Sequence, residues 1–145
     1  MFQRIMLTWD GSDVARNAFD VAIDIARRYE GELVAVSVAY SPAHAETHAD
    51  RQESVDAAHR YLEETFREVE DRAHRAGVDV EHQIIEGDTP ARALLDHAHE
   101  HGFDLIVCGH HHTRRAGRLL LHDVADDLFR DALTPVLVVG ENSRR

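Results

Sequence analysis

Histidine is the residue type that first suggests chemistry in this chain, which contains 12 of them. Three are consecutive, at His110, His111 and His112, and His122 follows in the same segment. Imidazole is a good ligand for zinc, copper or nickel. Adjacent side chains of an extended loop point in different directions, however, and no Cys/His pair has structural-zinc spacing. These four histidines are therefore weak candidates for metal ligands, and we predict no metal site.

The other histidines fit ordinary structural roles. His97 and His101 are spaced to share one face of a helix, and histidines in a last helical turn complement its dipole and bond its final carbonyls. His99 lies between them on another face of that helix, and we expect five others on the surface: His44, His48, His59, His74 and His82.

Arginines in the same segment offer a second chemistry. Arg114, Arg115 and Arg118 could form an anion site together with the three consecutive histidines, which protonate near pH 6.5. The alternative is that these are solvated loop charges that pair with an acidic surface, and we favour it.

Catalytic motifs are not evident. The chain has no G-x-S-x-G elbow, no phosphate-binding G-x-x-x-x-G-K-[ST] loop and no G-x-G-x-x-G after its first strand. A turn with Ser12 as a helix N-cap accounts for Asp10-Gly11-Ser12 without a nucleophile. Cys108 lies in an apolar run, so a reactive thiol is not expected. We predict a protein that is not an enzyme.

Composition narrows the class of partner. The net charge is −11, and all 16 basic residues are Arg. Such a surface repels nucleic acid and anionic membranes. Adaptation to high salt would explain the acidity, although a GC-rich genome would also replace Lys by Arg. The single cysteine and the lack of a long apolar run favour a reducing, cytoplasmic location.

Short apolar runs alternate with longer helical patterns along the 145 residues, which suit one domain. We expect strands at residues 4–9, 32–40, 78–87, 103–109 and 134–140. Thr89 and Pro90 mark a helix start, and Gly31, Gly77 and Gly102 mark helix ends. This order predicts an α/β three-layer sandwich, doubly wound around a five-stranded parallel sheet. Ligands of such sheets bind beyond the carboxyl ends of the strands, here at Asp10 and after Gly109.

Three stretches together resemble the universal stress protein family. They are RIMLTWDGSDVARNAFDVAIDIA at the start, EGDTPARALLDHA before DLIVCG, and LLLHDVADDLFRDALTPVLVV at the end. The resemblance covers nearly the whole chain as one domain, residues 1–145. It implies the strand order 3-2-1-4-5 and a nucleotide-binding-like fold. It also implies a homodimer formed through the last strand, from Thr134 to Gly140.

ATP-binding members of that family carry Gly-x-x-Gly, nine residues, then Gly-Ser or Gly-Thr in the segment after the fourth strand. Here Gly109 keeps the first position, but His112 and His122 replace the other glycines, and Asp123 replaces the hydroxyl residue. By the same resemblance, Asp10 matches the acidic residue that contacts adenosine. Val38, Cys108 and Val124 fall on further nucleotide-contacting positions.

These replacements predict poor ATP binding. A histidine side chain obstructs the close backbone approach that glycine allows. Asp123 would repel a phosphate about 4 Å away by roughly 4 kcal/mol at an effective dielectric of about 20. Asp123 and Asp126 also resemble a capping box. The Asp123 carboxylate would then occupy the helix N-terminus, where the phosphates of a ligand would otherwise bind.

Three functions remain open from the sequence. The first is a stress-response binding or signalling module that does not hold ATP in the usual way and needs no cofactor. The second is a nucleotide sensor for AMP or ATP that keeps the adenosine end of the site. The third is a histidine-based metal-binding protein.

Overall fold

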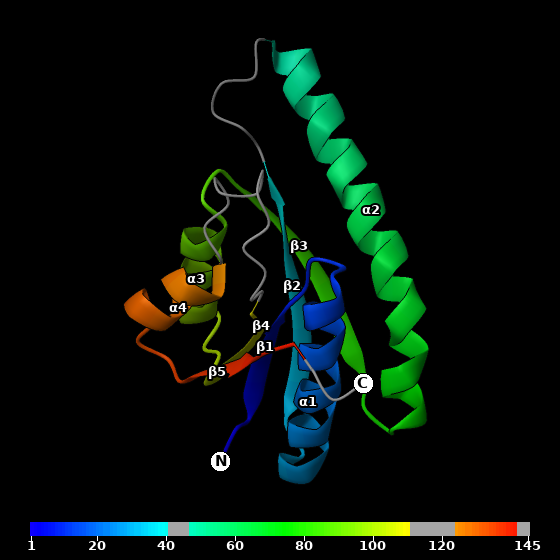
Figure 1. Ribbon diagram of the computed structural model, residues 1–145, viewed down its shortest axis with the longest axis vertical. Helices are drawn as coiled ribbons and strands as arrows, with labels where there is room; N and C mark the ends of the chain where they lie inside the picture. Colours follow the sequence, from blue (N-terminus) through cyan, green and yellow to red (C-terminus); the bar gives the residue numbers. More distant parts are fainter. Residues whose placement is uncertain (41–46, 111–123, 142–145) are drawn as a thin grey trace.

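The computed structural model describes residues 1–40, 47–110 and 124–141. Helices and strands alternate along the chain (Figure 1). The strands are β1 (Arg4–Thr8), β2 (Glu32–Tyr40), β3 (Val80–Gly87), β4 (Leu105–Gly109) and β5 (Val136–Val139). The helices are α1 (Asp13–Tyr29), α2 (His48–Arg75), α3 (Pro90–Glu100) and α4 (Val124–Asp131).

The five strands form one sheet in the order β3-β2-β1-β4-β5, and every neighbouring pair is parallel. Helices α1 and α2 cover one face, and α3 and α4 cover the other (Figure 1). The predicted three-layer architecture and strand order are confirmed. The order reverses between β1 and β4, so the ends of these two strands flank the switch point.

Each face of the sheet has its own hydrophobic core. The α1/α2 side is built around Trp9, Phe19 and Phe66, whose rings make edge-on contacts with one another. The α3/α4 side includes Met6, Ile106 and Leu128. Residues of β1 and β4 alternate between the two cores because successive side chains of a strand point to opposite faces.

Helix ends explain why two strands begin later than the sequence predicted. Val78 N–H donates to Ala73 O at 2.9 Å and Phe103 N–H to Ala98 O at 3.0 Å, so these residues close α2 and α3. The preceding glycines, Gly77 and Gly102, have φ of 79° and 68°. This is the Schellman arrangement, in which a left-handed residue satisfies the last carbonyls of a helix.

The end of α1 differs from the prediction. Glu30, rather than Gly31, adopts the left-handed conformation, with φ of 53°. A glycine is still required at the next position, because a Cβ on Gly31 would lie 2.4 Å from the carbonyl oxygen of Phe2.

The start of α3 also needs a correction. The helix begins at Pro90 as predicted, but the Thr89 side chain makes no capping hydrogen bond. Its hydroxyl instead donates to Asp88 Oδ1 at 3.4 Å. In the part of the chain that the structure describes, no helix is long and apolar enough to cross a membrane.

Candidate functional site

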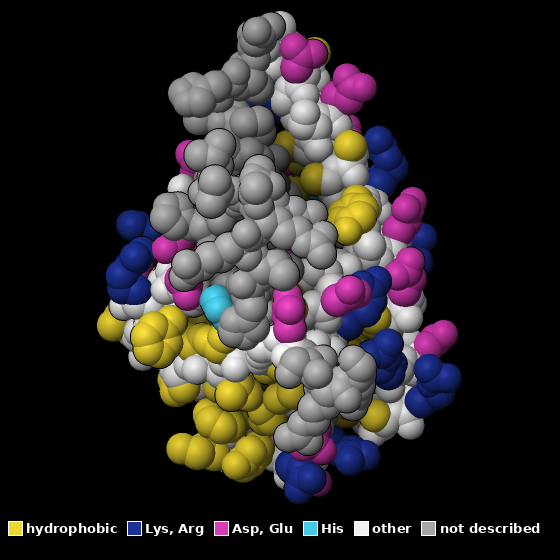
Figure 2. Space-filling view, in the orientation of Figure 1, with side chains coloured by type: hydrophobic (Ala, Val, Ile, Leu, Met, Phe, Trp, Pro, Cys, Tyr) yellow, Lys and Arg dark blue, Asp and Glu magenta, His cyan; other side chains and the backbone are white. Residues whose placement is uncertain are grey.

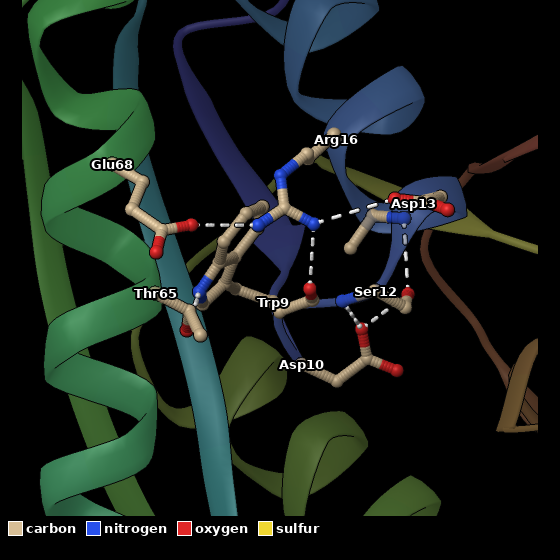
Figure 3. Close-up of polar contacts among 9 residues, drawn as sticks. Trp9, Asp10, Ser12, Asp13, Arg16, Thr65 and Glu68 are labelled. Atoms are coloured by element: carbon tan, nitrogen blue, oxygen red, sulfur yellow. Dashed lines mark hydrogen bonds and ion pairs between the residues drawn. The ribbon is translucent and has the colours of Figure 1, made fainter.

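The turn after β1 carries Asp10 and is stabilised from within. Asp10 Oδ1 accepts hydrogen bonds from Ser12 N–H at 2.9 Å and from the Ser12 hydroxyl at 2.5 Å (Figure 3). Gly11, between them, has φ of 81°, a conformation that L side chains rarely adopt. The turn therefore presents the exposed Asp10 at the carboxyl edge of the sheet.

Ser12 is the N-cap of α1. Its backbone is extended and its hydroxyl oxygen accepts a hydrogen bond from Ala15 N–H at 3.2 Å. This contact confirms the predicted N-cap.

Arg16 connects this turn to α2. One guanidinium nitrogen donates to Gly11 O at 2.8 Å, and the other forms an ion pair with Glu68 at 2.8 Å (Figure 3). The guanidinium carbon lies 5.9 Å from the centre of the Trp9 ring. Through these contacts the Arg16 guanidinium joins the start of α1 to α2.

Trp9, which precedes Asp10, is anchored at its side chain and at its backbone. Its indole N–H donates to Thr65 Oγ1 at 3.2 Å, and its carbonyl accepts the Ser37 hydroxyl at 2.7 Å. His82 Nε2 lies 2.8 Å from Ser37 Oγ. The sequence alone did not single out Ser37, Thr65 or His82, because their partners come from distant segments.

His82 was expected on the surface, and that expectation was wrong. Its ring is partly buried and stacks on Phe66, with 4.3 Å between the ring centres. Burial lowers the pKa of His82 from 6.5 to about 4, although nearby Glu63 opposes the shift. At neutral pH this imidazole is uncharged. It lies in a groove of about 530 Å³ between α2 and β3.

Gly109, at the end of β4, is needed for close packing. A Cβ at this position would lie 2.6 Å from the carbonyl oxygen of Val14, in the first turn of α1. Helix α1 can therefore approach the end of β4 only because residue 109 lacks a side chain. The resemblance to a nucleotide-binding glycine and this packing requirement fall on the same residue.

The other predicted positions lie in the same part of the fold. Val38 is half-buried and is two residues beyond Val36, the register partner of Thr8, so it is level with the start of the Asp10 turn. Cys108 is buried in the α3/α4 core, as predicted. Val124 opens α4 and packs against that core.

The phosphate end of the predicted site lies outside the described residues. This applies to His112, His122 and Asp123, and to His111 among the metal candidates. Helix α4 starts at Val124 and has Asp126 in its first turn. The cap by Asp123 and the loss of ATP binding therefore stay predictions.

The described histidines do not gather with other ligands. Among residues 1–40, 47–110 and 124–141, no three His, Cys, Asp or Glu side chains are placed to share a metal ion. The sequence predicted that His97 would bond the final carbonyls of its own helix. Its Nε2 instead lies 2.8 Å from Gln83 Oε1 of β3. Its ring centre is 4.2 Å from that of His101. Burial is the main cause that lowers the pKa of His97.

Comparisons with known proteins give matches to one family over nearly the whole chain. The profile of the universal stress protein family matches residues 1–140. A universal stress protein of Methanocaldococcus jannaschii is 30% identical over 141 residues, which are 96% of this chain and 82% of the relative.

Solved structures give the same result. The universal stress protein UspA from Lactobacillus plantarum superimposes with a TM-score of 0.81 at 26% identity, over 95% of this chain and 97% of the other. A universal stress protein in complex with cAMP gives 0.72 at 27% identity, over 95% and 97%. The chain belongs to the universal stress protein family.

Proposed function

We propose that this universal stress protein is a binding module for adenine nucleotides with a single phosphate, and that it binds ATP weakly. The observation that carries the proposal is the Asp10 turn, held at the carboxyl end of β1 beside Gly109 at the switch point of the sheet. The ligand would lie across the ends of β1 and β4, as in other open α/β sheets.

The nucleoside end of the site is supported by the described residues. The Asp10 carboxylate is exposed, and carboxylates at such edges accept hydrogen bonds from ribose or base donors. Val38 provides a half-buried apolar surface at the same edge. Gly109 keeps the backbone of β4 close to α1.

The preference for one phosphate is supported by the residue types of the segment after β4. His112, His122 and Asp123 stand where ATP-binding relatives have two glycines and a hydroxyl residue. A carboxylate near a triphosphate meets more than one negative charge, and each repulsion weakens binding. The relative solved with cAMP, at 27% identity, binds a nucleotide with one phosphate.

Calorimetry with AMP, cAMP and ATP on chelator-treated, tag-free protein tests this proposal. We expect AMP or cAMP to bind at least tenfold more tightly than ATP. Asp10→Asn should weaken AMP binding by about 10-fold or more, since hydrogen bonds to a charged group contribute about 1.5–3 kcal/mol. Asp13→Asn, which removes an exposed carboxylate from the adjacent helical turn, is the matched control and should change little.

Two results would overturn the proposal. One is micromolar ATP binding with no preference for the monophosphate. The other is an AMP affinity that Asp10→Asn leaves unchanged. The triple variant His112→Gly, His122→Gly and Asp123→Ser should restore ATP binding if the altered residues are its cause.

Binding without catalysis is the expected mode of action. The hydroxyl of Ser12 is engaged as a helix cap, and the thiol of Cys108 is buried. Incubation with ATP and AMP, followed by chromatography of the nucleotides, should show no turnover.

We also propose that the protein forms a homodimer through β5 and α4. Hydrophobic side chains gather over this part of the molecule, on the left of Figure 2. Phe129 is 75% exposed and Leu133 is 96% exposed, and Leu137 and Val138 of β5 are each 37% exposed. An apolar patch beside an unpaired strand edge is typical of an interface between copies. Light scattering at working salt should give the mass of a dimer, and a monomer mass would overturn this.

A further inference from the structure

Ser37 is the one buried polar side chain among the described residues, at 1% exposure. A hydroxyl that is removed from water must have its hydrogen bonds satisfied inside the protein. Ser37 Oγ has two such contacts, to Trp9 O at 2.7 Å and to His82 Nε2 at 2.8 Å.

The number of protons fixes the direction of these bonds. A serine hydroxyl has a single hydrogen to donate. The Trp9 carbonyl can only accept, so at 2.7 Å the Ser37 hydrogen must point to it. His82 Nε2 must then donate to Ser37 Oγ, which makes His82 the Nε2–H tautomer. The order is therefore His82 N–H to Ser37 O–H to Trp9 C=O.

The acceptor at the end of this series of hydrogen bonds is the carbonyl of the peptide bond that joins Trp9 to Asp10. A second, similar chain holds the side chain of Trp9: its indole N–H donates to Thr65 Oγ1, and the Thr65 hydroxyl donates to Leu62 O at 3.1 Å. In both chains a hydroxyl accepts from a ring N–H and donates to a backbone carbonyl. They reach Trp9 from β2 and β3 and from α2.

We propose that Ser37 and His82 are positioning residues for the nucleotide site: His82 orients the Ser37 hydroxyl, which holds the Trp9–Asp10 peptide where the Asp10 turn begins. Neither side chain needs to touch the ligand. The proposal rests on the proposed function for its effect on binding, but its effect on the Asp10 turn stands on its own.

Phe66 supports the same arrangement. Its ring stacks on His82 and also meets Trp9 edge-on, so one side chain of α2 orients both ends of the chain of hydrogen bonds. A change in the packing of α2 against β3 would therefore reach Asp10 through His82, Ser37 and Trp9.

Nuclear magnetic resonance on isotope-labelled protein, together with AMP calorimetry, tests the proposal. The ring nitrogen shifts of His82 should show the Nε2–H tautomer at pH 7. Ser37→Ala and His82→Phe should shift or broaden the amide signals of residues 10–12 and weaken AMP binding about five- to tenfold. His82→Gln, which places an amide N–H near the position of Nε2, should stay within about twofold of the wild type.

Val69→Ala is the control for a loss of stability alone. Val69 is buried in α2 and has no polar side-chain atom. This variant should unfold more easily than the wild type, with unchanged amide signals at residues 10–12 and unchanged AMP affinity.

The outcomes separate the two proposals. If the wild type does not bind AMP, the proposed function fails, while the tautomer and the amide signals still decide the positioning role. An Nδ1–H tautomer overturns the positioning role. So do signals at residues 10–12 that stay unchanged in both Ser37→Ala and His82→Phe, or AMP binding by these variants that equals that of the wild type.

Discussion

The two edge strands of the sheet, β3 and β5, differ in length, in the polarity of their side chains and in the helix beside them. Edge strand β3 has eight residues and carries charged or polar side chains such as Glu81, His82 and Gln83. The long helix α2 packs beside it, and Phe66 of that helix stacks on His82. At the other edge, β5 has four residues, all of them apolar, and its neighbour α4 exposes Phe129.

The difference lies in what each edge contacts within the chain. Phe66 of α2 stacks on His82 of β3, and both His82 and Gln83 have hydrogen-bond partners inside the protein. Phe129 of α4 and Leu137 and Val138 of β5 are exposed instead, where a second copy could cover them. We therefore expect substitutions near β3 to change the stability of the monomer and substitutions near β5 to change association.

Truncating one phenylalanine on each side of the sheet should give the largest difference in effect. Phe66 is 4% exposed and Phe129 is 75% exposed. Phe66→Ala should lower the free energy of unfolding by about 3–5 kcal/mol, because it leaves a cavity among Trp9, Phe19 and His82. Phe129→Ala should cost the monomer less than about 0.5 kcal/mol but weaken the dimer. Denaturant unfolding and sedimentation measure the two effects, and equal losses of stability would contradict the contrast.

The second largest effect should be a loss of folding stability in acid, caused by His82 of β3. The pKa of His82 is about 4 in the folded protein and 6.5 as its ordinary value, so between these pH values the unfolded chain binds more protons. The stability from neutral His82 is therefore complete above pH 6.5 and is lost as the pH falls towards 4. At about 1.4 kcal/mol per pKa unit, this loss of stability is about 3.5 kcal/mol at most, and solvent screening of the partly buried ring reduces it.

The variant His82→Gln removes the titrating imidazole and so isolates its contribution to the stability. Charged or titratable neighbours of the ring are His59, Glu63, Arg67 and Glu70 on α2 and Glu81 on β3, and all are kept in the variant. The difference in unfolding free energy between wild type and variant should change with pH between 6.5 and 4. A difference that is constant over this range would show that His82 does not titrate as described.

A charge placed on β5 should act on association alone. Val138→Glu puts a carboxylate on a half-exposed apolar position, and a symmetric interface would bring two copies of it together. We expect the dimer dissociation constant to rise about 30- to 100-fold, with little change in monomer stability. Ser54→Glu, on the exposed surface of α2, is the control. If both variants dissociate equally, the effect is one of net charge and not of the β5 surface.

Much of the fold could be predicted from the sequence because it depends on local patterns. Residues 32–40 are mostly apolar, and β2 has the predicted bounds. The apolar pattern of residues 55–76 predicted a stripe of seven residues on one face of the helix: Val55, Ala58, Leu62, Phe66, Val69, Ala73 and Ala76. Five of them are buried, and Ala58 and Ala76 are partly buried. Ser12 precedes an amphipathic helix and caps it as expected.

Two errors, at His82 and His97, occurred where a residue depends on a distant segment. His82 lies on an edge strand with only partial alternation, which reveals neither that α2 covers it nor that Ser37 meets its ring. His97 was assigned to its own helix end, yet it pairs with Gln83 across the gap between α3 and β3. Strand starts were placed too early because Val78 and Phe103 are apolar, although both close the preceding helix.

The sequence by itself determined the order of the elements and the family, since these follow from residue types and their spacing. Only the tertiary structure decided that Gly109 is needed for the approach of Val14, and that Ser37 and His82 hold the peptide before Asp10. The physical reason is that close approach and buried hydrogen bonds join segments far apart in the chain. Their geometry exists only once the sheet and its helices have packed together.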